Sequence, residues 1–485
     1  MKTIIQSVLL TSLLLFIPSC EDFLDTRPNE YANDPQATSD TLSKYNSVAD
    51  AIAELNGAYN NFKADIYQFE NFFYNDVQSD NCYVGGDGFN EEEIDELAIT
   101  SLNSKVRMDW NQYFSMIGTS TSVIENTRMM NTGISETEKR QIIAEAQWIR
   151  AFAYFDVIRI WGDAPIMDRL IPNITPENLD EVYPLLYPKR QPASEIYTLI
   201  RRELEEALPY LESRSNGAFR ATKGAAYGLL AKIYATEGNR NARDYRKVIN
   251  YCDMVIAENY QLVSNFDDMF NPANNFTSES IFEVDYTTTA GNWAYWVLFS
   301  EEDGTITWRR YCTPTHDFLA KFGAQDKRLA SSVVYKSVPY DTYYPANNYP
   351  IINKIRAKES NIILMRLADI LLLKAEALAE LNSTREAIEI VNVIRNRAGL
   401  LPVETGKSQE ETRLIVENER QLELFMEGHR WFDLLRNDRA IAVMMQHKDR
   451  NGKILFPSIP EFRMLWPVPQ NEKDANPNLA QNPGY

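Results

Sequence analysis

The sequence predicts a mostly α-helical fold in which paired helices form the body and irregular segments form a loop-rich half. Two long regions, about residues 110–257 and 362–436, carry apolar residues every three to four positions. Two others, about residues 66–108 and 260–359, lack this period and are rich in residues such as Gly, Asn, Thr, Tyr and Pro. With 485 residues and 44% apolar content, the chain can bury a sizeable core as one large or two moderate domains.

Residues 1–19 are typical of a signal peptide. Lys2 provides a short basic region, residues 4–17 are mostly apolar and uncharged, and Ser19 precedes Cys20. The apolar run is too short to span a bilayer as a helix. A small residue before cysteine suits a lipoprotein signal peptidase, so Cys20 is the predicted lipid anchor, and attached acyl chains hold a protein durably on a membrane. The alternative is an ordinary secretory signal that contains a cysteine.

After the anchor, residues 20–45 are polar with little periodicity and are predicted to form a lipidated tether. Residues 46–485 are predicted to form a single domain that starts with a helix at Ser47–Asp65. Gly162 and Pro165 are expected to end the helix before them, because neither residue continues a helix. The further predicted helical segments are Trp110–Met130, Thr137–Ile160, Ala193–Leu211, Thr222–Ala257, Ile362–Ala398 and Ser408–Arg436.

Two helical segments have similar patterns. Residues 229–238 and 371–380 each combine small residues with a following turn and a second helix. This pattern resembles the tetratricopeptide helix pair, in which neighbouring pairs stack to bury a common core. Ordinary antiparallel helix hairpins are the alternative. On the predicted helices or at their ends, Trp110, Trp148, Trp161 and Trp431 are expected in the core, as is Trp466; Arg150, Arg366, Arg395, Arg420 and Arg430 are expected in structural ion pairs.

Composition excludes several classes of function. The net charge of −19 argues against a nucleic-acid partner, because phosphate binding needs clustered Lys and Arg. No second apolar run is long enough for a membrane helix. Lipidation of Cys20 leaves Cys82, Cys252 and Cys312, which contain no CxxC pair and leave any disulfide pairing open. With three histidines in the whole chain, no metal site and no cofactor are predicted.

Enzymatic motifs are missing from the sequence. It contains no Walker loop, no dinucleotide-binding glycine motif, no GxSxG and no HExxH. Adjacent carboxylates such as Asp267 with Asp268, or Glu301 with Glu302, are expected on solvated faces of a chain with 68 acidic residues. The prediction is therefore a protein that is not an enzyme, with a glycosidase acid–base pair as the minor alternative.

Aromatic residues gather in the irregular regions beside amides and carboxylates. Flat rings bordered by hydrogen-bonding groups suit the apolar face and hydroxyl edge of a sugar. Packing under the loops is the alternative for each ring. The candidate ligand-binding residues are Trp293, Tyr295, Trp296, Trp308 and Tyr311 in one segment, and Asp80, Asn81, Tyr83 and Phe89 in the early loop.

Ordered motifs along nearly the whole chain resemble the SusD/RagB-like outer-membrane nutrient-binding lipoproteins of Bacteroidetes. They include Cys20 with Phe23-Leu24-Asp25, Ser79-Asp80-Asn81, Arg150-Ala151-Phe152, Trp161-Gly162-Asp163-Ala164-Pro165, Thr222-Lys223-Gly224, Asp326-Lys327-Arg328, residues 366–372, residues 427–434 and Gln481-Asn482-Pro483-Gly484-Tyr485.

The resemblance implies about four tetratricopeptide-like pairs in a superhelical body, a loop-rich nutrient-binding face and no catalysis. It implies a TonB-dependent, SusC-like transporter as partner, over which the lipoprotein sits as a hinged lid. It also implies attachment to the outer membrane, with surface exposure signalled by the acidic residues after Cys20. Ligand residues of this family lie in variable loops, so the candidate residues above follow from their location alone.

The expected function is capture of an oligosaccharide or polysaccharide at the cell surface and its delivery to the transporter. Peptide capture by the same architecture is the main alternative, and a surface glycosidase is a less favoured one. Binding assays with glycan and peptide panels separate the first two, and released reducing ends would indicate the third.

Overall fold

The computed structural model describes residues 43–85, 88–214, 218–286, 291–295, 312–339, 343–449 and 451–485. The predicted signal peptide, Cys20 and the tether up to residue 42 lie outside the described residues. In the described part of the chain, no helix is both long and apolar enough to cross a membrane.

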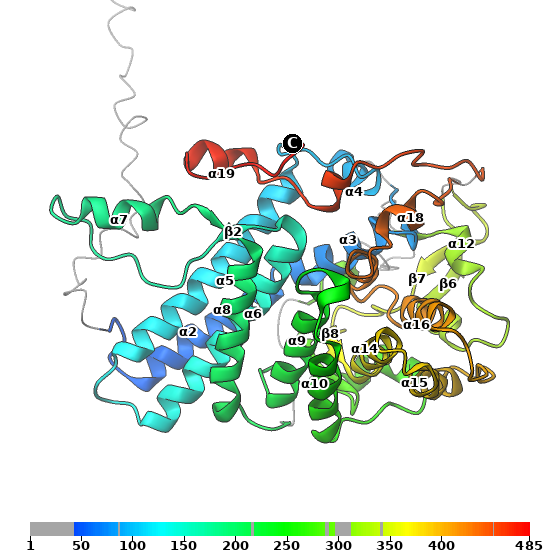
Figure 1. Ribbon diagram of the computed structural model, residues 1–485, viewed down its shortest axis with the longest axis horizontal. Coiled ribbons are helices and arrows are strands. Elements are labelled where there is room, and N and C mark those ends of the chain that lie inside the picture. The colour runs from blue at the N-terminus through cyan, green and yellow to red at the C-terminus, as the bar shows by residue number, and fades with distance from the viewer. Residues whose placement is uncertain are drawn as a thin grey trace, which may run out of the picture.

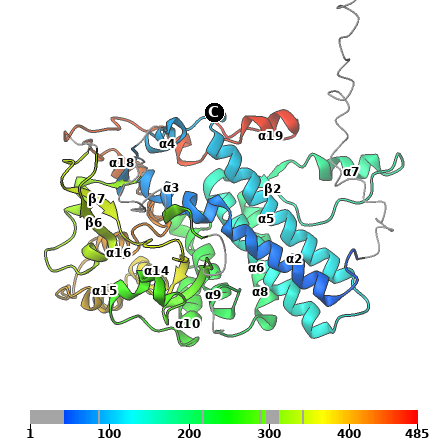
Figure 2. The same cartoon turned by 180° about the vertical axis from the view of Figure 1, so that it is seen from behind.

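The first helix, α2 (Val48–Asn60), begins where the sequence predicts. The Ser47 hydroxyl accepts a hydrogen bond from the Asp50 amide, and the Asp50 carboxylate accepts one from the Ser47 amide, which together form a capping box. The helix ends earlier than predicted, at Asn60, and a 3₁₀ turn follows at Asn61–Lys63. Figure 2 shows α2 running along α5, and it contacts both α5 and α6.

The interval 66–108, predicted to be irregular, is partly helical. It contains a π-helical turn (Ile66–Glu70), α3 (Asn71–Val77), the short strand β1 (Cys82–Tyr83), α4 (Phe89–Asp95) and the start of α5. All residues of the π-helical turn and nearly all of α3 are buried, so these helices have no exposed polar face opposite a buried apolar one. A helix buried on every side shows no amphipathic period, which explains the error.

Three long helices form the first half of the body: α5 (Ser104–Met129), α6 (Glu136–Trp161) and α8 (Ala193–Ala207). Helix α6 packs against both of the others. It begins in a capping box formed by Ser135 and Glu138 and ends at Gly162, whose φ of 74° lies in the left-handed region that glycine tolerates best. The five tryptophans predicted to be core residues, Trp110, Trp148, Trp161, Trp431 and Trp466, are all buried.

The helices of the second half follow in antiparallel pairs. Helices α9 (Lys223–Thr236) and α10 (Tyr245–Ala257) pack together, α10 also packs on α14 (Leu367–Glu380), and α14 contacts α15 (Thr384–Arg397) and α16 (Gln409–Glu423). Figure 1 shows these helices side by side along the body. The predicted fold class is confirmed: the molecule is mostly helical, with tetratricopeptide-like pairs and a loop-rich half.

Short antiparallel strand pairs hold the loop-rich half. β1 pairs with β5 (Thr313–Pro314), β4 (Ser280–Val284) with β8 (Ile362–Arg366), and β6 (Val333–Lys336) with β7 (Tyr349–Ile352). Residues 362–366 were expected to begin a helix and form β8 instead. A five-residue run of mostly apolar residues fits a buried strand as well as a buried helix, and its partner β4 is distant in sequence. The small helices here are α12 (His316–Leu319) and α13 (Arg328–Ser332).

The remaining short elements flank the body. β2 (Ala164–Pro165) pairs with β3 (Arg190–Gln191), and the chain between them carries α7 (Leu179–Leu186). Near the C-terminus lie α17 (Arg430–Arg436), α18 (Ala440–Met444) and α19 (Gln470–Ala475). The Trp466 amide donates to the Ile160 carbonyl (2.8 Å) and the Trp161 indole to the Pro467 carbonyl (3.1 Å). The C-terminal segment thus fastens onto the first half of the body.

The five arginines expected in ion pairs all have carboxylate partners. Arg366 contacts Glu279, Glu423 and Glu427, each at 2.6–2.7 Å. Arg150 pairs with Glu203, Arg395 with Glu419, Arg420 with Asp369 and Asp433, and Arg430 with Asp80 and Glu417. Most of these pairs join segments far apart in sequence, and two join the neighbouring helices α16 and α17, so the predicted structural role is confirmed.

Candidate functional site

Trp293 and Tyr295 lie in the described part of the segment predicted to bind ligand. Both side chains pack against the main core and remain partly exposed. The Trp293 indole donates a hydrogen bond to the Asp65 carboxylate (2.8 Å), and its ring lies 5.1 Å from that of Phe69. The Trp293 ring is therefore held in one orientation by residues just beyond α2. Trp296, Trp308 and Tyr311 lie outside the described residues.

Gly291 and Asn292 fix the backbone before Trp293. Gly291 has φ of 101°, and a Cβ there would lie 3.0 Å from the Lys358 Cβ, so both conformation and space favour glycine. The Asn292 amide donates to the Lys358 carbonyl (2.6 Å), and its side chain donates to the Ser360 carbonyl (3.1 Å). These contacts give the tryptophan a rigid support.

Asp80 and Asn81 hold the early loop from inside the protein. The Asp80 carboxylate accepts hydrogen bonds from Arg430 (2.7 and 3.0 Å) and Gln421 (3.0 Å). Burial alone would raise its pKa, but the charges of Arg430 and Lys321 and the bonds from Arg430 and Gln421 bring the pKa well below its usual value. Asn81 is fully buried and bonds Asp76 and Gln421. Because their polar groups are used internally, we leave both residues out of the site proposed below.

Tyr83 is also held by the protein. Its ring stacks on Tyr343 with centroids 4.4 Å apart and planes 9° apart, and its hydroxyl donates to the Lys448 carbonyl (3.1 Å). Burial is the main cause that raises the pKa of Tyr83, to about 12. Phe89, at the start of α4, is by contrast 69% exposed. Three of the candidate residues are thus described and accessible: Trp293, Tyr295 and Phe89.

A groove at the end of α2 adds residues that the sequence did not single out. It has a volume of about 200 Å³ and is lined by Asn56, Tyr59, Asn60, Phe62, Lys63, Phe219, Arg220, Phe282, Glu283, Val284 and Asp285. Asp65 links it to Trp293, because Asp65 follows the groove residue Lys63 by two positions. The groove has no motif because its wall combines a helix end, the end of β4 and residues 219–220.

The groove combines an aromatic surface with hydrogen-bonding groups. Arg220 lies over the Tyr59 ring (4.6 Å) and donates to Glu145 (2.8 Å) and Asn56 (2.7 Å). The Glu283 amide donates to the Ala218 carbonyl (2.6 Å), which brings the exposed Phe219 against the end of β4. Within the described residues, the Lys63 ammonium has no carboxylate within ion-pair distance, so it remains a donor for a ligand. We call Trp293 and this groove together the groove site.

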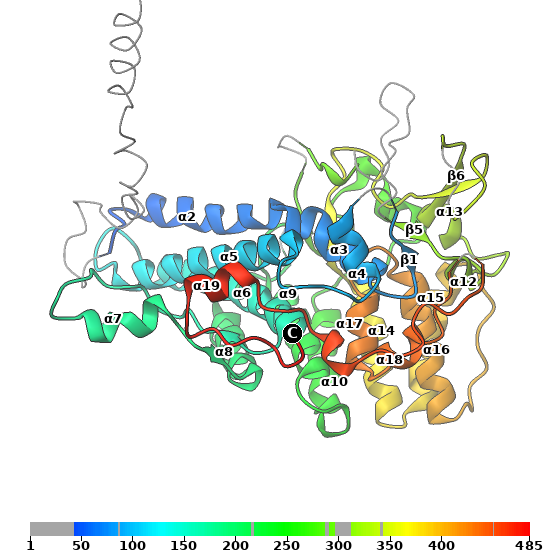
Figure 3. The same cartoon turned by 90° about the horizontal axis from the view of Figure 1, so that it is seen from above.

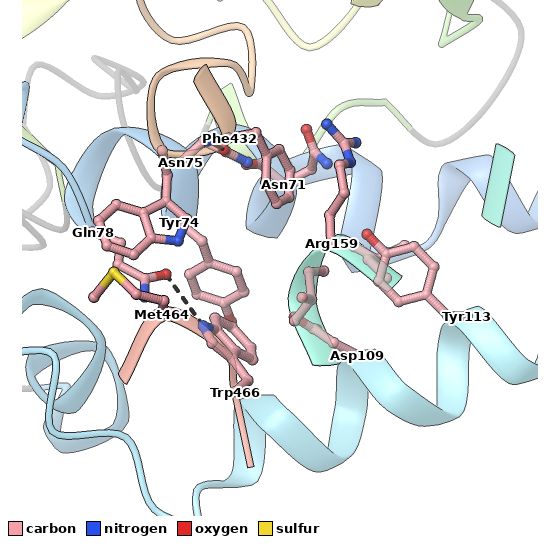
Figure 4. A pocket seen from close by; sticks show the side chains of 13 residues that line it. Asn71, Tyr74, Asn75, Gln78, Asp109, Tyr113, Arg159, Phe432, Met464 and Trp466 are labelled. Atoms are coloured by element: carbon pink, nitrogen blue, oxygen red, sulfur yellow. Dashed lines mark hydrogen bonds between the residues drawn. The ribbon is translucent and has the colours of Figure 1, made fainter. Parts of the chain in front are cut away.

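A second cavity, of about 20 Å³, lies inside the molecule, between α3, α5, α6 and α17 (Figure 4). Asp109 and Tyr74 line it, and one Asp109 carboxylate oxygen and the Tyr74 hydroxyl are buried without a hydrogen-bond partner in the described structure. Burial, reinforced by the charge of Glu70, holds the pKa of Asp109 well above its usual value. Polar cavities of this kind hold ordered water. Its depth between packed helices separates it from the groove site.

Several other reactive groups of the described residues are engaged or buried within the protein. Asp267 forms two hydrogen bonds with Arg356 (3.0 and 2.5 Å), and Asp268 accepts one from Asn265 (3.0 Å). Burial lowers the pKa of His429 to about 3. In the described ranges, no three His, Cys, Asp or Glu residues are grouped to hold a metal, and Cys82, Cys252 and Cys312 are buried, unbridged thiols. Glu301 and Glu302 lie outside the described residues.

Two family models match this sequence in different halves. The model described as "SusD family" matches residues 314–485, and the one described as "Starch-binding associating with outer membrane" matches residues 22–235. SusD-like protein P25 of Formosa agariphila is 26% identical to this chain, with 99% of both chains covered.

Solved structures show the same fold. A SusD superfamily protein from Bacteroides vulgatus has a TM-score of 0.77 at 20% identity, with 91% of this chain and 99% of that chain covered. Surface glycan-binding protein A from Bacteroides thetaiotaomicron, solved in complex with laminarihexaose, has a TM-score of 0.73 at 20% identity, with 90% and 99% covered. At these identities the similarity establishes the architecture alone.

Proposed function

The chain belongs to the SusD/RagB-like family, and from this premise we propose that it is a cell-surface lipoprotein that binds glycan at the groove site. In this proposal Cys20 carries the lipid anchor in the outer membrane, and the bound oligosaccharide or polysaccharide is delivered to a TonB-dependent, SusC-like transporter. The description of one matching family as starch-binding and outer-membrane-associated supports both the ligand class and the location.

One observation carries the proposal: a rigidly supported, partly exposed tryptophan bonds Asp65, two residues beyond Lys63 in the wall of a groove of mixed aromatic and polar character. Trp293 and Phe219 offer flat apolar surfaces, and Asn60, Lys63 and Arg220 offer hydrogen-bonding groups. A sugar ring presents an apolar face and a rim of hydroxyls, so it matches this combination.

Binding without catalysis is the chemistry that the described groove residues support. Among the carboxylates that line the groove, Glu283 is buried and accepts hydrogen bonds from Ser280, Asn361 and the Phe276 amide. A glycosidase needs one carboxylic acid and one carboxylate that face each other across a substrate. Glu283 is committed to the protein, so it is not available as half of such a pair.

The direct test is a binding assay with the mature protein. Isothermal titration calorimetry against starch, laminarin and oligosaccharides should detect glycan binding. A reducing-end assay of the same mixtures should detect no hydrolysis. Replacing Trp293 with Ala should lower affinity at least tenfold, since stacking on sugar depends on the indole face. Trp293→Phe keeps a flat ring and loses the bond to Asp65, so it should lose less. Phe219→Ala should also weaken binding.

Controls separate the ligand classes and the folding effects. Tyr210→Ala removes an exposed ring from the end of the α8 region and should leave affinity unchanged. Circular dichroism should show intact helices in every variant. Binding of peptides and not of glycans would show that the ligand is a peptide. Release of reducing ends would show that the protein is a glycosidase. Unchanged glycan affinity in both Trp293→Ala and Phe219→Ala would remove the groove site from the proposal.

A further inference from the structure

An arm, residues 166–189, projects from the body between β2 and β3. The two strands close its base, with Ala164 opposite Gln191 and Pro165 opposite Arg190. Figures 1 and 3 show α7, which belongs to this arm, beside the bundled helices near one end of the long axis, with β6 near the other end. Val182 is the one residue of the arm that is buried.

The arm exposes more apolar surface than folding explains. Ile171, Ile174, Leu179 and Tyr183 are each 45–54% exposed. Leu179 and Tyr183 are four residues apart in α7, so they lie on the same side of that helix. Scattered exposed apolar residues are ordinary, but four within thirteen positions of a projecting element are typical of a contact surface for another molecule.

Hydrogen bonds hold the arm in shape without a partner. The Met167 carbonyl accepts from the Thr121 hydroxyl (2.7 Å), and the Met167 amide donates to the Tyr154 hydroxyl (2.7 Å). Farther out, the Asn178 side chain donates to the Asn173 carbonyl (2.7 Å) and accepts from the Thr175 amide (2.8 Å). An ordered apolar surface binds at a lower entropic cost than one that must fold on contact.

The described chain begins beside the base of this arm. The Lys44 amide donates to the Asn126 side chain (3.1 Å), and Asn126 lies on α5 five residues beyond Thr121, which bonds the arm. Cys20 precedes Ser43 by 23 residues (43 − 20), and a chain of that length reaches at most ~80 Å. The arm is therefore at the end of the molecule where the described chain begins.

The charge of the arm favours a protein over a lipid surface. Its carboxylates are Asp168, Glu177, Asp180 and Glu181, against Arg169 and Lys189, so the net charge of residues 166–189 is −2 (2 − 4). Anionic membrane surfaces attract basic segments and repel acidic ones. A protein with an apolar depression and cationic groups around it matches both the exposed side chains and the charge.

We propose that the arm docks this lipoprotein onto the extracellular face of its transporter. The inference rests on the proposed function for the identity of the partner and concerns a surface distinct from the groove site. Ile171, Ile174, Leu179 and Tyr183 supply the buried contact, and the four carboxylates meet basic residues around it. Docking at the anchored end leaves the groove site, on other elements, to receive glycan.

Site-specific photo-crosslinking in intact cells tests the contact without disturbing the fold. A photoreactive amino acid at Ile174 or Leu179 should yield an adduct that mass spectrometry identifies as the TonB-dependent barrel. The same amino acid at Val393, which is 52% exposed on α15, is the matched control and should yield none. An adduct with lipid or with a second copy of this chain, or equal transporter crosslinking from Val393, would overturn the proposal.

A charge variant measures the contribution of the arm. The triple substitution Ile171→Asp, Ile174→Asp and Leu179→Asp should reduce co-purification with the transporter at least tenfold, while Val393→Asp should not. Glycan affinity of the isolated triple variant should stay within twofold of wild type, since the groove site is on other elements. Unchanged co-purification of the triple variant with the transporter would contradict the docking proposal. Absence of glycan binding in the wild type would instead count against the proposed function, whatever the crosslinks show.

Discussion

Buried ion pairs between distant segments hold the centre of this molecule together. Arg366 is fully buried and spreads its guanidinium over three carboxylates from segments about 60 to 90 residues away. Lys232 and Arg420 both contact Asp369, and burial is the main cause that lowers the pKa of Lys232. Desolvation of such groups is offset only when all partners are present, so these residues specify one packing arrangement.

His429, 3.9 Å from Asp369, should make the stability pH-dependent. Burial lowers its pKa to about 3, whereas an unfolded histidine titrates near ~6.5. Between these values the unfolded chain binds a proton that the folded chain does not, so the free energy of unfolding falls as pH drops. His429→Gln should remove up to ~1.4 kcal/mol per pH unit of this dependence between about pH 6 and 4.

Urea unfolding of the wild type and the variant over that pH range measures this contribution, because the difference between them cancels the other titrating groups. His316→Gln, which alters an exposed histidine on α12, is the control and should leave the slope unchanged. If the free energies of unfolding of His429→Gln and wild type change equally between pH 6 and 4, the buried imidazole does not titrate as stated.

Two of the candidate ligand residues show what the sequence cannot reveal at this scale. Asp80 and Asn81 lie in a polar stretch near aromatic residues, which looks like an exposed binding loop. Their partners Arg430 and Gln421 come about 340 to 350 residues later, and only the tertiary fold brings them together. Trp293 stays a predicted ligand residue with a partly exposed ring. The groove was not predicted, since its wall is assembled from three separate segments.

At the scale of elements, close approach between α9 and its neighbours is what permits the paired-helix frame. Gly228 on α9 faces β8 and α14, where a Cβ would lie 2.4 Å from the Met365 sulfur and 3.3 Å from Ile370. Both side chains are buried, so neither moves away freely. The same contact links a helix to the strand whose residues 362–366 were expected to be helical.

Gly228→Ala should therefore destabilise the protein by about 1–3 kcal/mol, because overpacking outweighs the better helix propensity of alanine. Gly118→Ala is the matched control: Gly118 is inside α5, and a Cβ added there would have no neighbour within 4 Å outside its own helix turn, so alanine should stabilise by up to about 1 kcal/mol. Urea midpoints of the two variants should shift in opposite directions. Equal shifts would mean that helix propensity, and not helix spacing, decides the outcome.

At the scale of the whole molecule, the fold class was predictable because the long amphipathic helices repeat their pattern many times. The positions of the halves were not, because they depend on contacts between distant segments. Arg190 donates to the Ala480 carbonyl (3.0 Å), and the C-terminal residues close over Trp161. Such polar contacts leave no periodic trace in the sequence.

Asn482 tests whether these contacts make the molecule one cooperative unit. Its side chain donates to the carbonyls of Trp161 (2.9 Å) and Trp466 (2.7 Å) and accepts from Arg190 (2.6 Å), and the residue is buried. Asn482→Ala removes the side-chain donor to the Trp466 carbonyl and one partner each from the Trp161 carbonyl and Arg190, so it should lower the free energy of unfolding by about 2–4 kcal/mol. Asn471→Ala, at an exposed position on α19, should change it by less than about 0.5 kcal/mol.

Tryptophan fluorescence and circular dichroism should follow one urea transition in the Asn482→Ala variant. The two signals should shift together and stay coincident, because the body retains its other contacts between halves. Two separated transitions would show that Asn482 and its neighbours are what couples the halves, and an unshifted one would show that the C-terminal closure contributes nothing to stability.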